Sequence, residues 1–553
     1  MTHILYKKYA PLFILVGAGL LLYGNTTSFG IVALDDSKYV IANYPFNRDI
    51  SNIATAFRVD IDYPSGYSIY YRPFQAISHI IDAQLSGAAP WAFHVTNIIL
   101  HIANTILLFS VFQKLGHERI QSFVFSLLFL VHPAVTGATA WIPGRVDTIL
   151  ALFTLASFYF FIRFCEQKKA RDLVFHAIFL AFAFFSKELA IVIPPLMAFY
   201  FFIHQKKIKY KNIALLVGVW IFVFLTWFIL WRTVAGGTGS LPFTRIAKLI
   251  IANSSAFLLY LGKMLLPFNL SALPTLQDSS LWYGIVTLIL LILGVLTGIR
   301  RISFVIFGTA WVFLFLAPSF YTDDPSSVSI FMEHRAYLPL IGFLFIVQEI
   351  KYVKSRYALI VATIIIFIYA GIAYSHSLNF RDRLSFWAHA AQSSPTLPKA
   401  HNGFGAALYL QGRNAEAETE YKKAIELNDN EWRVHNNLGL LYTDRKELEA
   451  AEKEFQKELE VYPLNADAHL NLGVLYYGYR QDYEKGREHW EKALALNPVS
   501  SQAHEYLAAY YYQQTGNIEE SIRHIKEALR ISGRVQPALE KILKEYERNR
   551  INR

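Results

Sequence analysis

Cysteine and charge are both scarce in this chain. A single cysteine among 553 residues leaves no partner for a disulfide and no set of thiolates for a zinc site. Charged residues make up 17% of the chain and hydrophobic residues 54%, whereas soluble domains carry about 25% charged residues. This balance excludes a disordered chain, a coiled coil and an ordinary soluble enzyme.

The net charge of +10 is unevenly distributed. Residues 399–553 hold 22 Lys and Arg against 25 Asp and Glu, a balance of −3. The first 398 residues hold 30 against 17, a balance of +13, and their positive charges flank apolar segments. The sequence therefore predicts contact with membrane lipid and no nucleic-acid partner.

Apolar segments recur from the N-terminus to about residue 375. A helix needs roughly 20 such residues to cross about 30 Å of hydrocarbon. We predict eleven spans, near residues 11–30, 96–112, 120–136, 148–163, 173–186, 188–204, 213–231, 282–299, 302–318, 336–349 and 357–375. Residues 246–267 are predicted to form an interfacial or re-entrant helix.

The charges of the short connections predict the orientation. Basic connections alternate with longer, more acidic ones, and Lys and Arg mark the cytoplasmic side. The N-terminus is therefore predicted to be cytoplasmic. Because eleven spans is an odd number, residues 399–553 are predicted on the opposite side, in the periplasm below a bacterial inner membrane or in the ER lumen.

A repeat occupies residues 399–553. The motif Ala/Val-His-x-x-hydrophobic-Gly/Ala places histidines at 401, 435, 469 and 504, with spacings of 34, 34 and 35 residues. This period predicts four tetratricopeptide repeats, each a pair of helices. The two helices are expected to approach closely at Gly405, Gly439, Gly473 and Ala508. The histidines are expected to pack or cap, and the chain after Gln536 to form a polar capping helix.

The predicted fold is therefore all-α, with two domains. Residues 1–380 form a polytopic membrane domain with a long first outer loop, residues 31–95. Residues 381–398 are a linker, and residues 399–553 form an α-solenoid of about four repeats. A solenoid of this kind presents a concave groove, which could hold an extended protein or peptide. A spacer or a dimer contact is the alternative role for the repeats.

Two adjacent carboxylates, Asp35 and Asp36, directly follow the first span. Neighbouring like charges raise the pKa of one carboxyl group, which suits a general base for a hydroxyl nucleophile. The pair could also bind a divalent cation, and no other cofactor is indicated. A solvated turn is the simpler interpretation. The position favours the catalytic one, because a lipid-borne substrate would present its head group there.

Polar residues line one face of the second span. His94, Asn97, His101 and Asn104 are spaced i, i+3, i+7 and i+10, which places them on one side of a helix. Polar groups inside a membrane are costly and face other protein groups. Hydrogen bonding between helices is therefore the simpler interpretation of this stripe.

Three cations, Arg145, Lys187 and Arg335, are predicted at the outer membrane face. An Arg fork matches phosphate oxygens and Lys adds a point charge, so these residues are candidates for a lipid phosphate site. Salt bridges to nearby carboxylates are the alternative. Further candidates for supporting roles are Arg72, His94, Asn97, His101, His132, Asp147, Glu188, Glu333 and His334.

Taken together, these motifs resemble the transmembrane and tetratricopeptide repeat-containing O-mannosyltransferases, of the C-type glycosyltransferase superfamily (GT-C), and their bacterial relatives. The resemblance implies a polyprenyl- or dolichyl-phosphate sugar donor, a protein Ser/Thr acceptor and inversion at the anomeric carbon. It also implies that Asp35 or Asp36 is the catalytic acidic residue. The motifs are Asp35-Asp36, Tyr71-Arg72-Pro73, His94-x-x-Asn97-x-x-x-His101, His132-Pro133, Gly144-Arg145-x-Asp147, Lys187-Glu188 and Glu333-His334-Arg335.

Two other functions compete with this interpretation. A ligase or polymerase of lipid-linked oligosaccharides would place its key residues in a large late outer loop, whereas the longest outer loop here is the first. A membrane-anchored scaffold that recruits partners through its repeats would need only one or two spans. A scaffold also gives no reason for carboxylates and cations to gather at one membrane face.

Overall fold

The structure, a computed structural model, describes residues 2–63, 70–204, 210–235, 243–320, 332–351, 356–532 and 537–551. The chain divides into two compact units, Met1–Ser394 and Pro395–Arg553. Helices account for both units, and no strand occurs among the described residues. The expected all-α fold, a polytopic helical unit followed by repeats, is confirmed.

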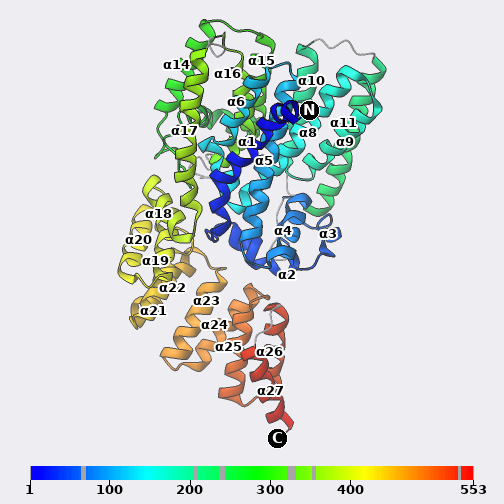
Figure 1. Ribbon diagram of the computed structural model, residues 1–553. Helices are drawn as coiled ribbons and strands as arrows, with labels where there is room; N and C mark the ends of the chain where they lie inside the picture. The colour runs from blue at the N-terminus through cyan, green and yellow to red at the C-terminus, as the bar shows by residue number, and fades with distance from the viewer. Residues whose placement is uncertain are drawn as a thin grey trace. The chain divides into compact units, whose positions relative to one another are not determined.

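The first unit is a bundle of long helices with short helices at one end (Figure 1). Helices α2, α3 and α4 of the first loop gather at that end, where α2 and α3 contact α4. The helices are α1 Thr2–Tyr23, α2 Tyr44–Asn47, α3 Asn52–Thr55, α4 Pro73–Ser86, α5 Trp91–Lys114, α6 Arg119–Leu130, α7 Thr136–Ala140, α8 Arg145–Gln167, α9 Ala170–Phe184, α10 Ile193–Ile203, α11 Tyr210–Ala235, α12 Phe243–Ala252, α13 Ser255–Leu265, α14 Trp282–Leu296, α15 Ile302–Leu316, α16 Tyr337–Gln348, α17 Arg356–Ser377 and α18 Arg383–Ser393.

Each of the eleven predicted spans coincides with a helix, but the helices differ in length. Among the described residues, six helices are long and apolar enough to cross a membrane, and a seventh results if the bent pair Arg119–Leu130 and Pro133–Ala140 is one span. Glu188–Ile203 and Trp282–Leu296 are shorter apolar helices, and α16 has 12 residues. The unit is thus a multi-pass membrane protein, while the count of eleven spans and the side of the repeats stay predictions.

Residues 246–267 contain two short helices in place of the single predicted one. Helix α12 ends at Ala252 and α13 begins at Ser255. The break lies at Asn253, whose side-chain amide donates a hydrogen bond to the carbonyl of Phe320 (2.8 Å). At 11 residues, α13 is about 16 Å long, roughly half the thickness of the hydrocarbon layer.

The segment 381–398, expected as a linker, contains helix α18 and lies in the first unit as far as Ser394. Asp382 caps this helix, because its side chain accepts a hydrogen bond from the backbone N–H of Ser385. Phe386 and Trp387 are buried, and the indole of Trp387 donates to the carbonyl of Val32 (3.1 Å). Burial of these rings holds the helix against the membrane unit, a tertiary effect that composition did not indicate.

Glycines allow two helices of the membrane unit to pack closely. A Cβ on Gly308 of α15 would lie 2.5 Å from the carbonyl oxygen of Gly342 of α16, and a Cβ on Gly342 would lie 2.7 Å from that of Gly308. The indole of Trp311 then donates to the carbonyl of Leu338 across the same interface (2.8 Å). The contact fixes α16, which follows the segment that carries His334 and Arg335.

The second unit consists of four helix pairs and a final helix, stacked in chain order (Figure 1). The four-repeat prediction and the capping helix are confirmed. The first pair is α19 Pro398–Leu410 with α20 Asn414–Leu427, and the second is α21 Val434–Asp444 with α22 Leu448–Val461. The third is α23 Ala466–Val474 with α24 Tyr483–Leu496, the fourth is α25 Ser501–Tyr510 with α26 Ile518–Ser532, and α27 spans Pro537–Ile551.

The repeat glycines lie where the sequence predicts close contact. A Cβ on Gly405, Gly439 or Gly473 would lie 2.7, 2.7 or 2.3 Å from an aromatic ring of the paired helix. The rings belong to Tyr421, Phe455 and Trp490, which are all buried. Glycine in the first helix and a large ring in the second therefore form the core of each of these repeats.

Candidate functional site

Four separate segments of the membrane unit supply one group of charged side chains, here called the charged cluster: Arg72, Asp147, Lys187, Glu188, His334 and Arg335. Arg72 immediately precedes α4, and Asp147 lies in the first turn of α8. Lys187 and Glu188 lie between α9 and α10, where the 3-10 helix η5 (Glu188–Val192) begins. His334 and Arg335 lie in η8 (Glu333–Ala336), before α16. Folding thus gathers six predicted site residues from more than 250 positions of sequence.

The charged cluster contains two ion pairs and a longer contact to the His334 imidazole. The Nζ of Lys187 lies 2.6 Å from Oδ1 of Asp147, and Nε2 of His334 lies 3.8 Å from Oδ2 of the same carboxylate. The guanidinium of Arg72 donates from two nitrogens to Oε2 of Glu188, at 3.2 and 3.0 Å. For Lys187, the structure therefore shows the salt bridge to a nearby carboxylate that was the alternative to a phosphate contact.

Burial shifts the pKa values of the cluster. Burial lowers the pKa of the Lys187 ammonium, and the neighbouring charge of Asp147 only partly opposes the shift. Burial also lowers the pKa of His334 to about 3, so its imidazole is neutral at physiological pH. The positive charge of Arg335 contributes to both shifts.

Two carboxylate oxygens of the cluster are buried and have no hydrogen-bond partner. They are Oδ2 of Asp147 and Oε1 of Glu188. Buried polar atoms are normally paired, so orphaned acceptors indicate a bound water or a ligand.

Asp35 and Asp36 have different environments. Asp36 is buried, and its carboxylate accepts hydrogen bonds from the backbone N–H groups of Val32 (2.6 Å) and Leu34 (3.0 Å). Burial raises the pKa of Asp36, with these hydrogen bonds opposing the shift. Ala33 within this turn has a φ of 59°, a left-handed conformation that costs a non-glycine residue about 1–3 kcal/mol. Asp36 therefore holds a strained turn, whereas Asp35 is exposed.

Tyr39 connects the Asp35 turn with the charged cluster. Burial raises the pKa of the Tyr39 phenol, and the negative charge of Asp35 and the positive charge of Arg72 both act on it. The backbone N–H of Tyr39 also donates to the carbonyl of Asp35 (3.1 Å).

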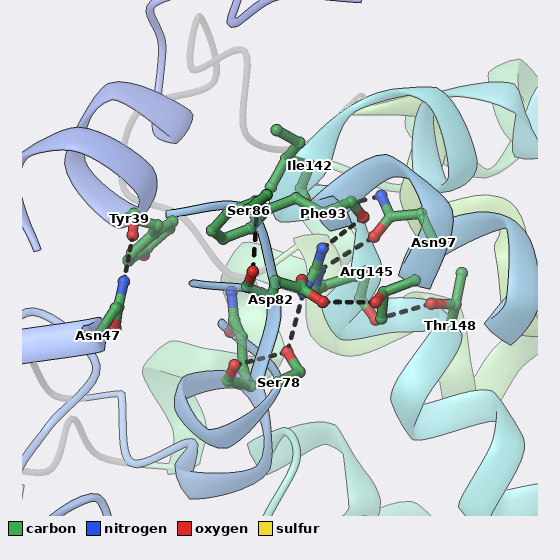
Figure 2. Close-up of polar contacts among 12 residues, drawn as sticks. Tyr39, Asn47, Ser78, Asp82, Ser86, Phe93, Asn97, Ile142, Arg145 and Thr148 are labelled. Atoms are coloured by element: carbon green, nitrogen blue, oxygen red, sulfur yellow. Dashed lines mark hydrogen bonds and ion pairs between the residues drawn. The ribbon is translucent and has the colours of Figure 1, made fainter. Parts of the chain in front are cut away.

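Arg145 lies elsewhere, in a fully buried clamp between α4, α5 and α8 (Figure 2). Its guanidinium pairs with Asp82 and donates to the side chain of Asn97 (2.9 Å) and the carbonyl of Phe93 (2.6 Å). It also donates to Ser78 (3.2 Å). Asp82 in turn accepts from Thr96 (2.5 Å). These contacts occupy Arg145 from both sides, so a phosphate would have to displace them.

The polar stripe of the second span forms hydrogen bonds between helices, as the simpler interpretation predicts. His101 contacts the hydroxyl of Tyr337 (2.7 Å) and the carbonyl of Leu130 (3.0 Å). Asn104 donates to the carbonyl of Thr148 (2.8 Å). His94 contacts the carbonyl of Gly30 (3.4 Å), and His132 contacts the carbonyl of Met264 (3.0 Å). These supporting candidates hold α5, α6, α8, α13 and α16 together.

Glu333 belongs to a second buried group that includes two residues missed by the sequence analysis. Its carboxylate accepts from the ammonium of Lys263 (2.7 Å) and lies 3.0 Å from Nε2 of His376. Burial would raise the pKa of Glu333, but the charge of Lys263 and the contact with His376 outweigh it and hold the pKa at about 2. Lys263 could have been found from sequence, because an ionisable residue in an apolar segment is a functional candidate.

An apolar groove of about 580 Å³ lies between α6, α13, α16 and α17. It reaches from Glu118 and Tyr357 to His132, Met264 and Tyr369, and aliphatic side chains such as Leu344 and Ala362 line it. His132 lies just before the 3-10 helix η3 (Pro133–Val135), which contacts η8. The groove therefore leads toward the segment that carries His334 and Arg335.

A metal centre built from several protein ligands is absent from the part of the chain that the structure describes. No group of three or more His, Cys, Asp and Glu is arranged there to hold an ion.

Comparisons with known proteins place the membrane unit among mannosyltransferase-like sequences. Residues 76–231 match the family described as dolichyl-phosphate-mannose-protein mannosyltransferase. Residues 405–444 and 474–534 match tetratricopeptide repeat families. The first match contains Arg145, Asp147, Lys187 and Glu188 and excludes Asp35, Asp36 and Arg335.

Curated relatives match parts of the chain. The chain is 32% identical to human protein O-mannosyl-transferase TMTC2 over 156 residues, which are 27% of this chain and 18% of the relative. It is 25% identical to Caenorhabditis elegans protein O-mannosyl-transferase F38B6.6 over 392 residues, 65% of this chain and 54% of the relative. Among solved structures, MamA has 20% identity and a TM-score of 0.24, over 28% of this chain and 87% of that one. The chain is thus homologous to the O-mannosyltransferases, and the matches span about half of those relatives or less.

Proposed function

We propose that this chain is a membrane glycosyltransferase that moves mannose or another hexose from a polyprenyl- or dolichyl-phosphate donor to Ser/Thr hydroxyls of proteins. The observation that carries the proposal is the charged cluster. Four distant segments bring cations, a neutral imidazole and two orphaned carboxylate oxygens together. The homology to O-mannosyltransferases supports a sugar donor and a protein acceptor as the substrates.

The apolar groove supports a lipid-linked donor. A polyprenyl chain is apolar and flexible, and a groove with aliphatic walls among membrane helices suits it. The groove leads toward η8, so a lipid bound there would carry its phosphate toward His334 and Arg335.

Lys187, Arg335 and Arg72 are the cations proposed to bind the donor phosphate. An ammonium has three donor hydrogens and a guanidinium has five; the pair with Asp147 uses one of Lys187, and the pair with Glu188 uses two of Arg72. Positive charge at this point stabilises the departing phosphate as the sugar–oxygen bond breaks. Arg145, bound on both sides, is proposed instead to position α4 against the membrane helices.

Asp35 is the proposed base. The acceptor hydroxyl must lose its proton as the sugar transfers, which requires a base within hydrogen-bond reach. Asp35 is exposed and its backbone carbonyl accepts from the N–H of Tyr39, whereas the carboxylate of Asp36 is buried and accepts from backbone N–H groups. Attack from the face opposite the phosphate would invert the anomeric carbon. A divalent cation bound at Asp35 is a further part of the proposal.

A transfer assay tests the function. The full chain in lipid nanodiscs would receive polyprenyl-phosphate mannose and a Ser/Thr-rich peptide, and mass spectrometry would detect the added hexose. We expect transfer by the parent chain and loss of transfer by the Asp35→Asn variant. A parent chain that folds, binds donor and leaves every acceptor unmodified would contradict the proposal.

A further inference from the structure

The four repeats use two different partners for the same histidine. In the first two repeats, Nδ1 of the histidine lies 2.6 Å from a glutamate, in the pairs His401–Glu420 and His435–Glu454. In the last two, the glutamate is replaced by a second histidine, 20 residues after the first. The repeat array therefore consists of a His–Glu half and a His–His half.

The ring nitrogens of the His–Glu half favour a charged imidazole. Nε2 of His435 lies 2.9 Å from the carbonyl of Asp429, while Nδ1 faces Glu454. Both partners are acceptors, so only an imidazolium can donate to both. The contact with Glu454 raises the pKa of His435 despite burial. His401 makes the equivalent pair of contacts, with Glu420 and the carbonyl of Pro395.

Each pair of the His–His half can hold at most one charged ring. Nδ1 of His469 lies 3.0 Å from Nδ1 of His489, and Nδ1 of His504 lies 2.8 Å from Nδ1 of His524. A hydrogen bond between two ring nitrogens needs one donor and one acceptor, so full protonation of both rings would bring two N–H groups into contact. Two imidazoles alone fall short of the three or four protein ligands that a zinc site takes, and no larger ligand group occurs among the described residues.

Burial and the flanking cations oppose protonation of these pairs, whereas the flanking glutamates favour it. The guanidinium of Arg523 faces Nε2 of His524 at 3.4 Å. The other groups that act on the fourth-repeat pair are Arg530, Glu491, Glu520 and Glu527, and Tyr511 stacks on His524. Lys485, Lys492 and Glu452 act on the third-repeat pair, and Tyr476 stacks on His489. Burial lowers the pKa of His489 and of His524 to about 4.

We propose that the repeat array responds to protons unevenly, so that mild acid shifts the third and fourth repeats toward opening and leaves the first two protected. The sign follows from proton uptake. The His–His half binds fewer protons folded than unfolded, so its stability is complete above about pH 6.5 and is lost as the pH falls toward about 4. At His435, in the His–Glu half, the raised pKa means that the fold binds more protons than the unfolded chain. This contribution to stability is therefore lost as the pH rises. A partner chain lying across the whole groove would be released by acid from one end.

Hydrogen exchange of the full chain in detergent micelles, followed by mass spectrometry at pH 7.5 and 5.5, tests the proposal. One histidine with a pKa near 4 in the fold and about 6.5 unfolded changes the opening equilibrium about tenfold at pH 5.5. Both rings of each pair keep some exposure, and solvent reduces such shifts. We therefore count one shifted histidine in each pair and expect a tenfold loss for each pair. After correction for intrinsic exchange, it should appear in residues 466–532 and not in residues 398–461. Equal loss in all four repeats, or no loss, would overturn the proposal.

Exchanging the partners provides matched variants. The double variant His489→Glu and His524→Glu gives the last two repeats the pairing of the first two, and should keep its protection at pH 5.5. The reverse change, Glu454→His, should make the second repeat acid-sensitive. Loss of protection in the double variant equal to that of the parent would show that other groups cause the opening. The test involves no sugar transfer, so its outcome is independent of the proposed function.

Discussion

The two units of this chain place their ion pairs differently. In the membrane unit, Arg145 and Asp82 have no exposed side-chain surface, and Lys263 and Glu333 are 7% and 4% exposed. In the repeat unit, Arg413 and Glu416 are 46% and 59% exposed. The buried pairs join residues 63 and 70 positions apart, whereas the exposed pair lies within one helical turn. The buried pairs of the first unit therefore fix its tertiary structure, while the exposed pair of the second chiefly solvates a surface.

The largest expected effect concerns the adjacent carboxylates of the membrane unit. Asp35→Asn should lower turnover by roughly 10²–10⁴-fold with donor binding retained, because the amide removes the basic oxygen. Asp36→Asn should cause a milder loss through the turn it holds, and the double variant should be non-additive. Rates and donor affinities in the nanodisc assay would measure the difference. Parent-like transfer by a folded Asp35→Asn chain would remove Asp35 from the chemistry.

The second prediction contrasts the ion pairs directly. Arg145→Ala leaves Asp82 buried and uncompensated, which should destabilise the membrane unit by about 3–5 kcal/mol. Arg413→Ala in the repeat unit should leave the unfolding temperature nearly unchanged, because solvent screens this exposed pair. Thermal unfolding in detergent would measure both, with Arg145→Met plus Asp82→Leu as the control that removes both charges. Equal, small effects of the two single variants would mean that the clamp is unnecessary.

The third prediction separates binding from stability within the membrane unit. Lys187→Ala and Arg335→Ala each remove a proposed phosphate contact, worth about 1.5–3 kcal/mol for a charged hydrogen bond. Apparent donor affinity should therefore fall roughly 10–100-fold. Saturation with donor at parent concentrations in both variants would locate the phosphate site elsewhere.

The fourth prediction tests how the repeat unit is held together. Gly439→Ala would place a Cβ 2.7 Å from the ring of Phe455. Overpacking of this kind costs about 1–3 kcal/mol, and a solenoid confines such damage to neighbouring repeats. Hydrogen exchange should rise around the second repeat while transfer to a short peptide continues. Loss of that transfer in the variant would show that the two units are energetically coupled.

The smallest expected effect comes from removing the repeats altogether. Deletion from Lys399 onward should spare transfer to a short peptide and reduce transfer to a folded protein acceptor. The reason is that the concave groove of the repeats, and not the apolar groove of the membrane unit, is proposed to hold the acceptor chain. Steady-state rates with the two acceptors would compare them. A stably inserted truncation that loses both activities equally would show that the repeats complete the active site.

The sequence by itself determined the repeat unit almost entirely. Its period of 34 residues placed every helix pair, and its glycines lie against the rings of the paired helices. A solenoid permits this because each residue contacts only its own and neighbouring repeats, so sequence distance and spatial distance agree. In the membrane unit, sequence likewise placed the apolar helices, whose lengths the bilayer dictates.

Only the tertiary structure decided what each buried charge does. Arg145, Lys187 and Arg335 look alike in sequence, but folding surrounds Arg145 with Asp82, Asn97 and Phe93, and places Lys187 on Asp147. Sequence could not distinguish Asp35 from Asp36 either, because the backbone N–H groups that engage Asp36 come from the shape of the turn. The physical reason is the low dielectric of the interior, which makes the interaction of a buried charge with its partner strong. The partner therefore decides the role of the charge, and that partner is remote in sequence.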